Sequence, residues 1–270
     1  MSIVQRVTDA VKRAAVGTRW GSALAEVRRQ LNYMQSTPSA LGTVANDELA
    51  LALTVGICRN QRTFLDIGAH IGSVLADVLL TAPQIEVVAF EAIPEKAANL
   101  ARRFPTIAVH QCAAGDGEGE VPFFVVLTAS GFSSLARTTD ANEIRVPMRR
   151  VDALVSRADV IKIDVEGAEL GVLRGAARLI NSSRPVVMFE SSVDAAECAG
   201  YPVDEMFVWW AERDYVLLVP NRLAHDGPSL SRQGFLEAHY FPRRTTNYFA
   251  VPAERRLEIR DRARAVIGVE

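Results

Sequence analysis

TFLDIGAHIG, residues 63–72, is the stretch from which the fold of this 270-residue chain can be inferred. Apolar residues lead to Asp66, a turn runs through Gly68 and Gly72, and a helical pattern begins at Ser73. In α/β proteins, a strand that ends in a carboxylate and continues through a glycine turn into a helix builds a nucleotide pocket. We expect the glycines to let the backbone approach a ligand, and the amides of the helix to face it.

Two common nucleotide-binding motifs do not fit this turn. A dinucleotide fingerprint that starts at Gly68 needs glycine where His70 and Ser73 stand, and a phosphate-binding loop needs a Gly-Lys pair that is absent. The next predicted strand leads to Glu91, near the distance from Asp66 at which ribose-binding acids stand. A nucleoside without phosphates fits this combination, and S-adenosylmethionine is the commonest cofactor of that kind. The turn alone would equally suit a plain strand-to-helix connection.

The composition excludes several classes of protein. Hydrophobic residues make up 49% of the chain, which is enough for a large core and excludes intrinsic disorder. A net charge of −2 gives no positive field for nucleic acid. The longest apolar run, residues 49–58, is too short to cross a bilayer, and we expect no signal peptide. Three separated cysteines without metal-binding spacing are typical of a reduced compartment, so we expect a cytoplasmic protein.

The patterns predict one large domain with two appendages. Residues 1–42 read as an N-terminal helical arm, which could cap the domain, cover the cofactor or mediate contacts in a homodimer. The main domain spans 43–252; its first helix should begin at residues 46–48, and within it 119–150 read as an antiparallel insertion and 220–246 as a candidate lid loop. Residues 253–270 read as an exposed C-terminal helix.

A second motif, ADVIKIDVEGAELGVLRGA, occupies residues 158–176. The apolar residues Val160, Ile161 and Ile163 predict a buried strand that ends at Asp164, and we expect Glu166 to begin the following helix, as a complement to the helix dipole. Lys162 lies on the same face of the strand as Asp164. A buried lysine needs a carboxylate partner, which should be Asp164 or Glu190 at the end of the strand VVMFE.

The chain resembles the FkbM family of S-adenosylmethionine-dependent methyltransferases over about residues 62–192. The resemblance rests on the segments FLDIGAHIG, VVAFEAIPE, CAAGDGEGE, SGFSSL, VPMRRVDAL, DVIKIDVEGAELGVLRGA and RPVVMFE. It implies a Rossmann-like class I methyltransferase fold, an α/β architecture with a seven-strand, mostly parallel sheet, helices on both faces and an antiparallel last strand. It also implies O-methylation of a hydroxyl on a sugar, a glycolipid or a secondary metabolite.

The resemblance assigns residues to the two ends of the cofactor. The Asp66 turn would border the methionine end, Glu91 would hold the ribose hydroxyls, and Cys112 would border the adenine, where the small residues 113–117 leave room for a flat ring. The residues expected to bind the cofactor are Asp66, Gly68, Ala69, His70, Gly72, Glu91, Ala92, Cys112 and Ala113. His70 departs from the family, which often has asparagine at that place.

The expected chemistry is an in-line displacement at the methyl group, which also needs a base or a metal ion to take the proton of the acceptor hydroxyl. We expect Asp164 to face the acceptor, as base or as ligand of a divalent ion such as Mg²⁺, with Glu190 in support and His239 as a weaker candidate. The alternatives are a non-catalytic S-adenosylmethionine-binding protein, N-methylation of a small-molecule amine and a nicotinamide oxidoreductase. The acceptor should be a small molecule or a glycan.

Overall fold

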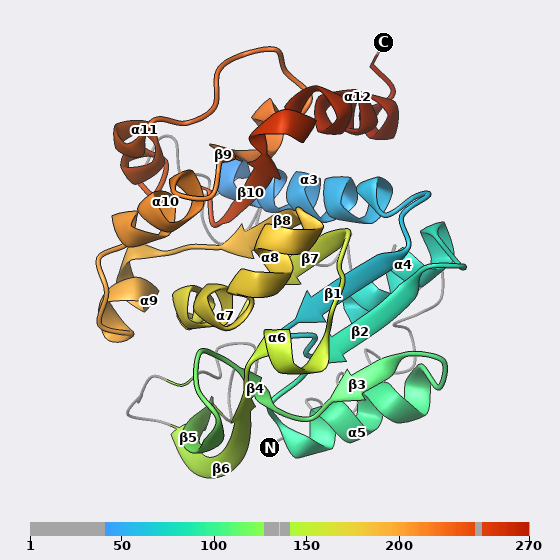
Figure 1. Cartoon of the computed structure of the whole chain (residues 1–270), viewed down its shortest axis with the longest axis vertical. Coiled ribbons are helices and arrows are strands. Elements are labelled where there is room, and N and C mark those ends of the chain that lie inside the picture. Colours follow the sequence, from blue (N-terminus) through green and yellow to red (C-terminus); the bar gives the residue numbers. More distant parts are fainter. Residues whose placement is uncertain (1–40, 127–134, 136–140, 241–244, 270) are drawn as a thin grey trace.

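A seven-stranded sheet with the order β3-β2-β1-β7-β8-β10-β9 forms the centre of the computed structural model (Figure 1). The structure describes residues 41–126, 135, 141–240 and 245–269. The strands are β1 (Thr63–Ile67), β2 (Glu86–Phe90), β3 (Ala108–His110), β7 (Val160–Ile163), β8 (Val186–Glu190), β9 (Tyr215–Leu218) and β10 (Asn247–Pro252). β10 is antiparallel to both of its neighbours, whereas β3, β2, β1, β7 and β8 pair in parallel. The predicted class I methyltransferase fold is thereby confirmed.

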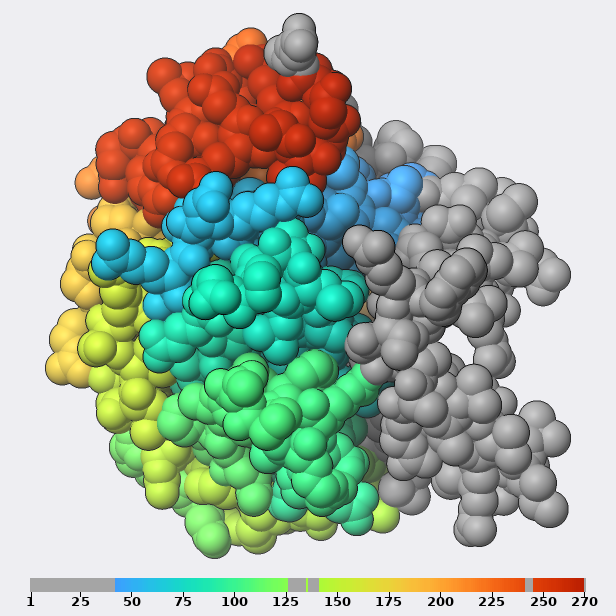
Figure 2. Space-filling view, turned by 90° about the vertical axis from the view of Figure 1, so that its right-hand side faces the viewer, coloured from blue at the N-terminus to red at the C-terminus, as the bar shows by residue number. Residues whose placement is uncertain are grey.

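Helices cover both faces of this sheet, and each face has its own hydrophobic cluster. On one face lie α3 (Leu41–Ile57), α4 (Ser73–Thr81), α5 (Pro94–Arg103) and α12 (Arg256–Ile267). On the other lie α6 (Val151–Leu154), α7 (Glu169–Gly175), α8 (Ala177–Ser183), α9 (Val193–Cys198), α10 (Asp204–Ala211) and α11 (Arg232–Glu237). Figure 2 shows α12 in red beside α3 in blue on the first of these faces.

The alternation of side chains along the strands decides where the polar residues point. Phe64, Val160 and Met188 belong to the cluster under α3 and α4, and their neighbours in the strands belong to the opposite cluster. Because successive side chains of a strand alternate between faces, the positions two or four residues onward return to the α3 side. Four acidic side chains at the carboxyl ends of neighbouring strands therefore lie on the α3 side, namely Asp66, Glu91, Asp164 and Glu190.

The predicted antiparallel insertion forms a second, smaller sheet with the order β4-β6-β5. β5 (Gly119–Val126) pairs antiparallel with β6 (Ala141–Arg149), and β4 (Ala113–Ala114) joins β6 in parallel. A third hydrophobic cluster connects this sheet to the residues that follow β2. Of the predicted polar loop 130–135, only Leu135 lies within the described residues.

Several predicted boundaries are wrong. The first helix is already formed at Leu41 instead of beginning at residues 46–48, and α7 begins at Glu169, because Glu166 has a left-handed backbone with φ of 54°. The C-terminal helix is not simply exposed, since Ile259 and Ala263 are buried against the α3 side. The predicted arm lies outside the described residues up to residue 40.

The predicted lid loop, 220–246, contains regular structure in its described part. It holds the 3₁₀ turn η3 (Pro220–Arg222) and α11, and both Leu223 and Phe235 are fully buried. Its role as a lid stays a prediction. None of the helices described here is long and apolar enough to cross a membrane.

Candidate active site

A cavity of about 270 Å³ opens at the carboxyl ends of β1, β2 and β7. Such an edge is where open α/β sheets bind their ligands, and the volume is near the lower end of the range for small-molecule sites. Of the residues predicted for the cofactor, Asp66, Gly68, Ala69, His70, Glu91, Ala92, Cys112 and Ala113 line this cavity. Gly72 is not among the lining residues. The structure thus brings together side chains from three strands, while their contact with a cofactor stays a prediction.

The two glycines of the first turn are needed for contacts within the protein. Gly68 has φ of 84°, and a Cβ atom there would lie 1.8 Å from the carbonyl oxygen of Asp164. Gly72 has φ of 77°, and its Cβ would lie 2.7 Å from side-chain atoms of Leu100 and Phe104. Each glycine therefore makes room for another part of the chain, and the approach of a ligand to the backbone at Gly68, which lines the cavity, stays a prediction.

Glu91 is held rigidly at the side of the cavity. Its Oε2 accepts a hydrogen bond from the backbone N–H of His70 at 2.8 Å, and its Oε1 accepts one from that of Ile93 at 2.9 Å. Burial raises the pKa of this carboxyl, although the two amides and Lys96 act in the opposite direction. Each oxygen keeps a second lone pair, so the carboxylate can still accept hydrogen bonds from hydroxyl groups of a ligand.

The opposite part of the cavity is apolar and comes from the smaller sheet. Ala113, Ala114, Phe123 and Leu135 line it, and a flat ring could pack between such side chains. The thiol of Cys112 is buried here, and burial raises its pKa to about 11. It is therefore a neutral wall residue at physiological pH and not a nucleophile.

Lys162 lies under the cavity with its ammonium group surrounded by oxygen atoms. Nζ is 3.2 Å from Asp66 Oδ1 and 3.2 Å from Asp164 Oδ2, and it donates a hydrogen bond to the carbonyl oxygen of Gly68 at 3.2 Å. Burial by itself would lower the pKa of Lys162, but the two carboxylates outweigh it and raise the pKa. Of the two expected alternatives, Asp164 is the partner, and Asp66 is a second partner that was not predicted from the sequence.

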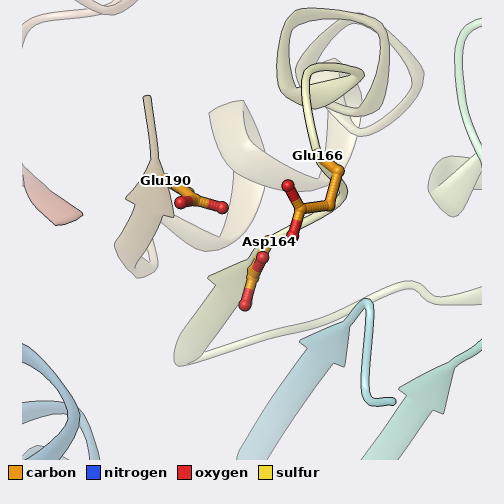
Figure 3. Close-up of side chains that lie close together, drawn as sticks. All are labelled: Asp164, Glu166 and Glu190. Atoms are coloured by element: carbon orange, nitrogen blue, oxygen red, sulfur yellow. The ribbon is translucent and has the colours of Figure 1, made fainter. Parts of the chain in front are cut away.

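Asp164, Glu166 and Glu190 converge from β7, the loop after β7 and the end of β8 (Figure 3). One carboxylate oxygen of each lies within 4.8 Å of those of the other two, which is the only such group of potential metal ligands among the described residues. Asp164 and Glu166 line the cavity, and Glu190 stands behind them. The three acids therefore form one cluster, of which two members can reach a ligand.

The three acids differ in protonation. The pKa of Asp164 is lowered, because Lys162 and a hydrogen bond with Glu190 outweigh the effect of burial. Burial and the charge of Asp164 raise the pKa of Glu190 to about 10, and they raise that of Glu166 to about 8. These shifts favour the ionised form of Asp164 and the protonated form of Glu190, which can then donate a hydrogen bond to Asp164.

The loop that carries Glu166 is fixed by the residues around it. Glu169 Oε1 accepts hydrogen bonds from the backbone N–H groups of Val165 and Gly167, both at 3.1 Å, and the Tyr201 hydroxyl donates one to the Gly167 carbonyl at 3.2 Å. Glu169 therefore ties the loop before α7 to the first residue of that helix. The left-handed backbone of Glu166 is held in place from both sides, and such strain is commonest at functional sites.

His239 is not among the residues that line the cavity, and its role as a base stays a prediction. Its side chain is buried, with Nε2 at 3.0 Å from Ser191 Oγ and Nδ1 at 2.8 Å from the Phe235 carbonyl oxygen. The ring stacks on Tyr248, and burial lowers its pKa. Both nitrogens are thus engaged within the protein, and the histidine fixes the connection between α11 and β8.

Some lining residues were not predicted from the sequence. Ile93 and Lys96 follow Glu91 at the start of α5, and their position directly after a strand end could have indicated them. Phe123 and Leu135 come from the insertion, and no local pattern places them at this cavity.

Comparison with known proteins supplies a family. The model of the methyltransferase FkbM domain matches residues 66–217, more than half of the chain. No curated protein matches the sequence. Among solved structures, the methyltransferase FkbM from Methylobacillus flagellatus KT is similar, with 20% identity, a TM-score of 0.46 and coverage of 71% of this chain. This chain spans 44% of that protein. The precorrin-6y C5,15-methyltransferase from Geobacter metallireducens GS-15 is 13% identical, with a TM-score of 0.38 and coverage of 63% of this chain and 72% of its own.

Proposed function

The chain belongs to the methyltransferase FkbM domain family, and from this premise we propose that it methylates a hydroxyl group of a sugar, a glycolipid or a secondary metabolite. Membership makes it an S-adenosylmethionine-dependent methyltransferase. The choice of oxygen as the accepting atom, the acceptor, a homodimeric state and a cytoplasmic location belong to the proposal. The observation that carries it is the ionised carboxylate of Asp164 at the edge of the cofactor cavity.

The cavity fits the cofactor of the family. Glu91 offers a rigid carboxylate suited to the two ribose hydroxyls, and the apolar wall around Phe123 suits an adenine ring. The cations among the lining residues are Lys96 and Lys162, with His70 as the titratable one. Lys162 forms ion pairs with Asp66 and Asp164, and Lys96 interacts electrostatically with Glu91. Both lysines therefore interact with carboxylates of the protein, and neither belongs to a glycine-rich phosphate-binding loop.

When bound, S-adenosylmethionine supplies a methyl group that its sulfonium makes electrophilic. The remaining tasks of the protein are to place the acceptor oxygen in line with that group and to take its proton. Asp164 can do both, because it is ionised and partly exposed toward the cavity. Glu190 supports it by donating a hydrogen bond that keeps the carboxylate in one orientation.

Glu166 is the second group that could take the proton. It lines the cavity beside Asp164, and its pKa of about 8 is closer to the operating pH than that of Asp164. A base whose pKa is near the operating pH transfers protons most efficiently. We assign orientation of the acceptor to Asp164 and retain Glu166 as an alternative for the final proton acceptor.

A divalent ion is the other way to activate the acceptor. Asp164, Glu166 and Glu190 present carboxylate oxygens, the hard ligands that Mg²⁺ prefers, within 4.8 Å of one another. Glu190 would have to lose its proton to become a ligand, so metal binding would release a proton. The same three residues would therefore activate the acceptor either by taking its proton or by binding a magnesium ion.

The test measures transfer of a labelled methyl group to a panel of glycans, glycolipids, amino sugars and secondary metabolites by mass spectrometry. We expect methylated hydroxyls. Labelled amines would favour N-methylation instead, and binding of S-adenosylhomocysteine without any transfer would favour a non-catalytic protein.

Asp164→Asn keeps the shape of the side chain and removes its charge. We expect methyl transfer to fall by at least about 100-fold, the usual size of a general-base contribution, while affinity for S-adenosylhomocysteine changes much less. Asp194→Asn, on the exposed first turn of α9, is the matched control and should leave transfer unchanged. Near-normal turnover of Asp164→Asn would show that the chemistry is elsewhere in the cavity.

Chelator treatment then separates a base from a metal ion. Loss of transfer with EDTA and its recovery with Mg²⁺ would assign the acids to a metal site. Unchanged transfer in EDTA would assign Asp164 or Glu166 as the base.

A further inference from the structure

The ammonium group of Lys162 stands where the two halves of the site meet. Asp66 and Gly68 belong to β1 and its following turn, and Asp164, which lines the same cavity at the end of β7, is the residue proposed above to face the acceptor. Asp66 and Lys162 are direct neighbours across β1 and β7, and the N–H of Asp164 donates to the Ile67 carbonyl at 3.0 Å. One side chain therefore contacts both the turn that holds the cofactor and the carboxylate that receives the acceptor.

Lys162 makes polar contacts with three oxygen atoms of the protein, one in a hydrogen bond and two in ion pairs. An ammonium group has three N–H donors, and three oxygen atoms lie at 3.2 Å from Nζ, on Asp66, Gly68 and Asp164. The side chain is 5% exposed. Lys162 thus binds the first turn and both carboxylates at the same time.

We propose that Lys162 is a positioning residue, which fixes the carboxylate of Asp164 relative to the turn that holds the methyl donor. This inference rests on the proposed function. An in-line transfer depends on the alignment of three atoms, and a displacement of about 1 Å can cost about 100-fold in rate. Gly68 brings the first turn close to Asp164, because only a residue without a Cβ atom lets the backbone of the turn contact the Asp164 carbonyl.

A structural ion pair is the alternative, and a simple deletion would not distinguish the two. Lys162→Met alone leaves Asp66, which is 1% exposed, as a buried charge without its cation, and the protein could fail to fold. We therefore compare the Asp66→Asn variant with the double variant Asp66→Asn/Lys162→Met. The second substitution removes the cation in a background from which the buried anion is already gone.

The readout is the ¹³C–¹H spectrum of S-adenosylmethionine labelled in its methyl group and bound to the full-length protein. It needs no acceptor, and it reports the surroundings of the methyl group directly. We expect the methyl resonance of the double variant to shift and broaden relative to that of Asp66→Asn, because Asp164 and the turn are no longer held together. Once an acceptor is known, transfer should fall by at least about 100-fold between these two variants, with a much smaller change in affinity for S-adenosylhomocysteine.

Superimposable methyl resonances in the two variants, or equal transfer rates, would overturn the inference and leave Lys162 as a structural residue. Arg184→Met, which removes an ion pair with Glu254 before the start of β8, is the control for loss of stability alone. It should not move the resonance. If the double variant does not fold, Lys162→Gln, which keeps an N–H donor, replaces Lys162→Met and the same comparison decides. Failure of the unmodified protein to bind the labelled cofactor would instead refute the proposed function.

Discussion

At the scale of single residues, Glu91 shows how a binding group can be fixed before its ligand arrives. Its two oxygens are held by the backbone N–H groups of His70 and Ile93, so a ligand hydroxyl meets a carboxylate that needs no reorientation. Preorganisation of this kind increases affinity because little side-chain entropy is lost on binding.

We expect Glu91→Ala to weaken the binding of S-adenosylhomocysteine by about 1–3 kcal/mol, through loss of charge-assisted hydrogen bonds. Isothermal titration calorimetry measures this change. Glu95→Ala, on the exposed first turn of α5, is the control and should leave the affinity unchanged. An indifferent Glu91→Ala, or tighter binding of NAD than of S-adenosylhomocysteine, would contradict the assignment.

The burial of His239 leads to a prediction of how the free energy of unfolding depends on pH. Burial lowers its pKa below the usual 6.5, so the unfolded chain binds a proton more readily than the folded one. The stability that depends on neutral His239 is therefore complete above about pH 6.5 and is lost as the pH falls through the folded pKa. Urea unfolding at pH 7.5 and pH 5.5 should show this loss in the natural protein.

In His239→Gln, part of that pH dependence should disappear, together with about 1–3 kcal/mol of the free energy of unfolding at pH 7.5 from the lost hydrogen bonds. His225→Gln removes an exposed histidine and is the control. An identical pH dependence in the natural protein and in His239→Gln would show that another group causes it.

At the scale of elements, α12 is an amphipathic helix whose buried face belongs to the core. Ile259 and Ala263 are fully buried, and Gly56 of α3 leaves room for Val266, since a Cβ atom there would lie 2.2 Å from that side chain. Most helical stability in proteins comes from such a packed face and not from helix propensity. The final helix is therefore part of the domain and not an appendage.

Ile259→Ala should lower the free energy of unfolding by about 2–5 kcal/mol, because it removes buried methyl groups and leaves a cavity. Leu257→Ala, in the same helix at a side chain that is 65% exposed, should change it by less than about 0.5 kcal/mol. Urea denaturation of the two variants checks this difference. Equal effects would mean that α12 does not pack on α3 in solution.

At the scale of the whole molecule, the sheet collects its acids at one edge. Five parallel strands end at the same edge, and their alternation directs Asp66, Glu91, Asp164 and Glu190 to the α3 side of it. A ligand that contacts this edge links segments from both halves of the chain. Its binding should therefore stabilise the entire domain.

S-adenosylhomocysteine at about 100 times its Kd should stabilise the folded state by about 2.7 kcal/mol and raise Tm accordingly. Differential scanning calorimetry of the full chain measures the shift. NAD at the same concentration serves as the control, and a larger shift with NAD would favour a nicotinamide oxidoreductase.

Much of this architecture follows from local patterns in the sequence. The apolar runs before Asp66, Glu91 and Asp164 mark three buried strands, and each acid stands at the end of its run. Pro94 marks the start of α5, where its missing N–H and fixed φ are tolerated. Such features depend on neighbours in the chain, so one sequence is enough to predict them.

The remaining features depend on contacts between distant segments, and only the tertiary structure decided them. The sequence could not show that Lys162 pairs with Asp66 across β1 and β7, because strand order is not written in any local pattern. Only the structure shows that the ring of His239 is buried against Tyr248, and that Glu166 has a left-handed backbone ahead of the helix that it was expected to begin. Local periodicity determines which face a side chain takes, whereas its partner, its burial and its charge are fixed only when the elements pack.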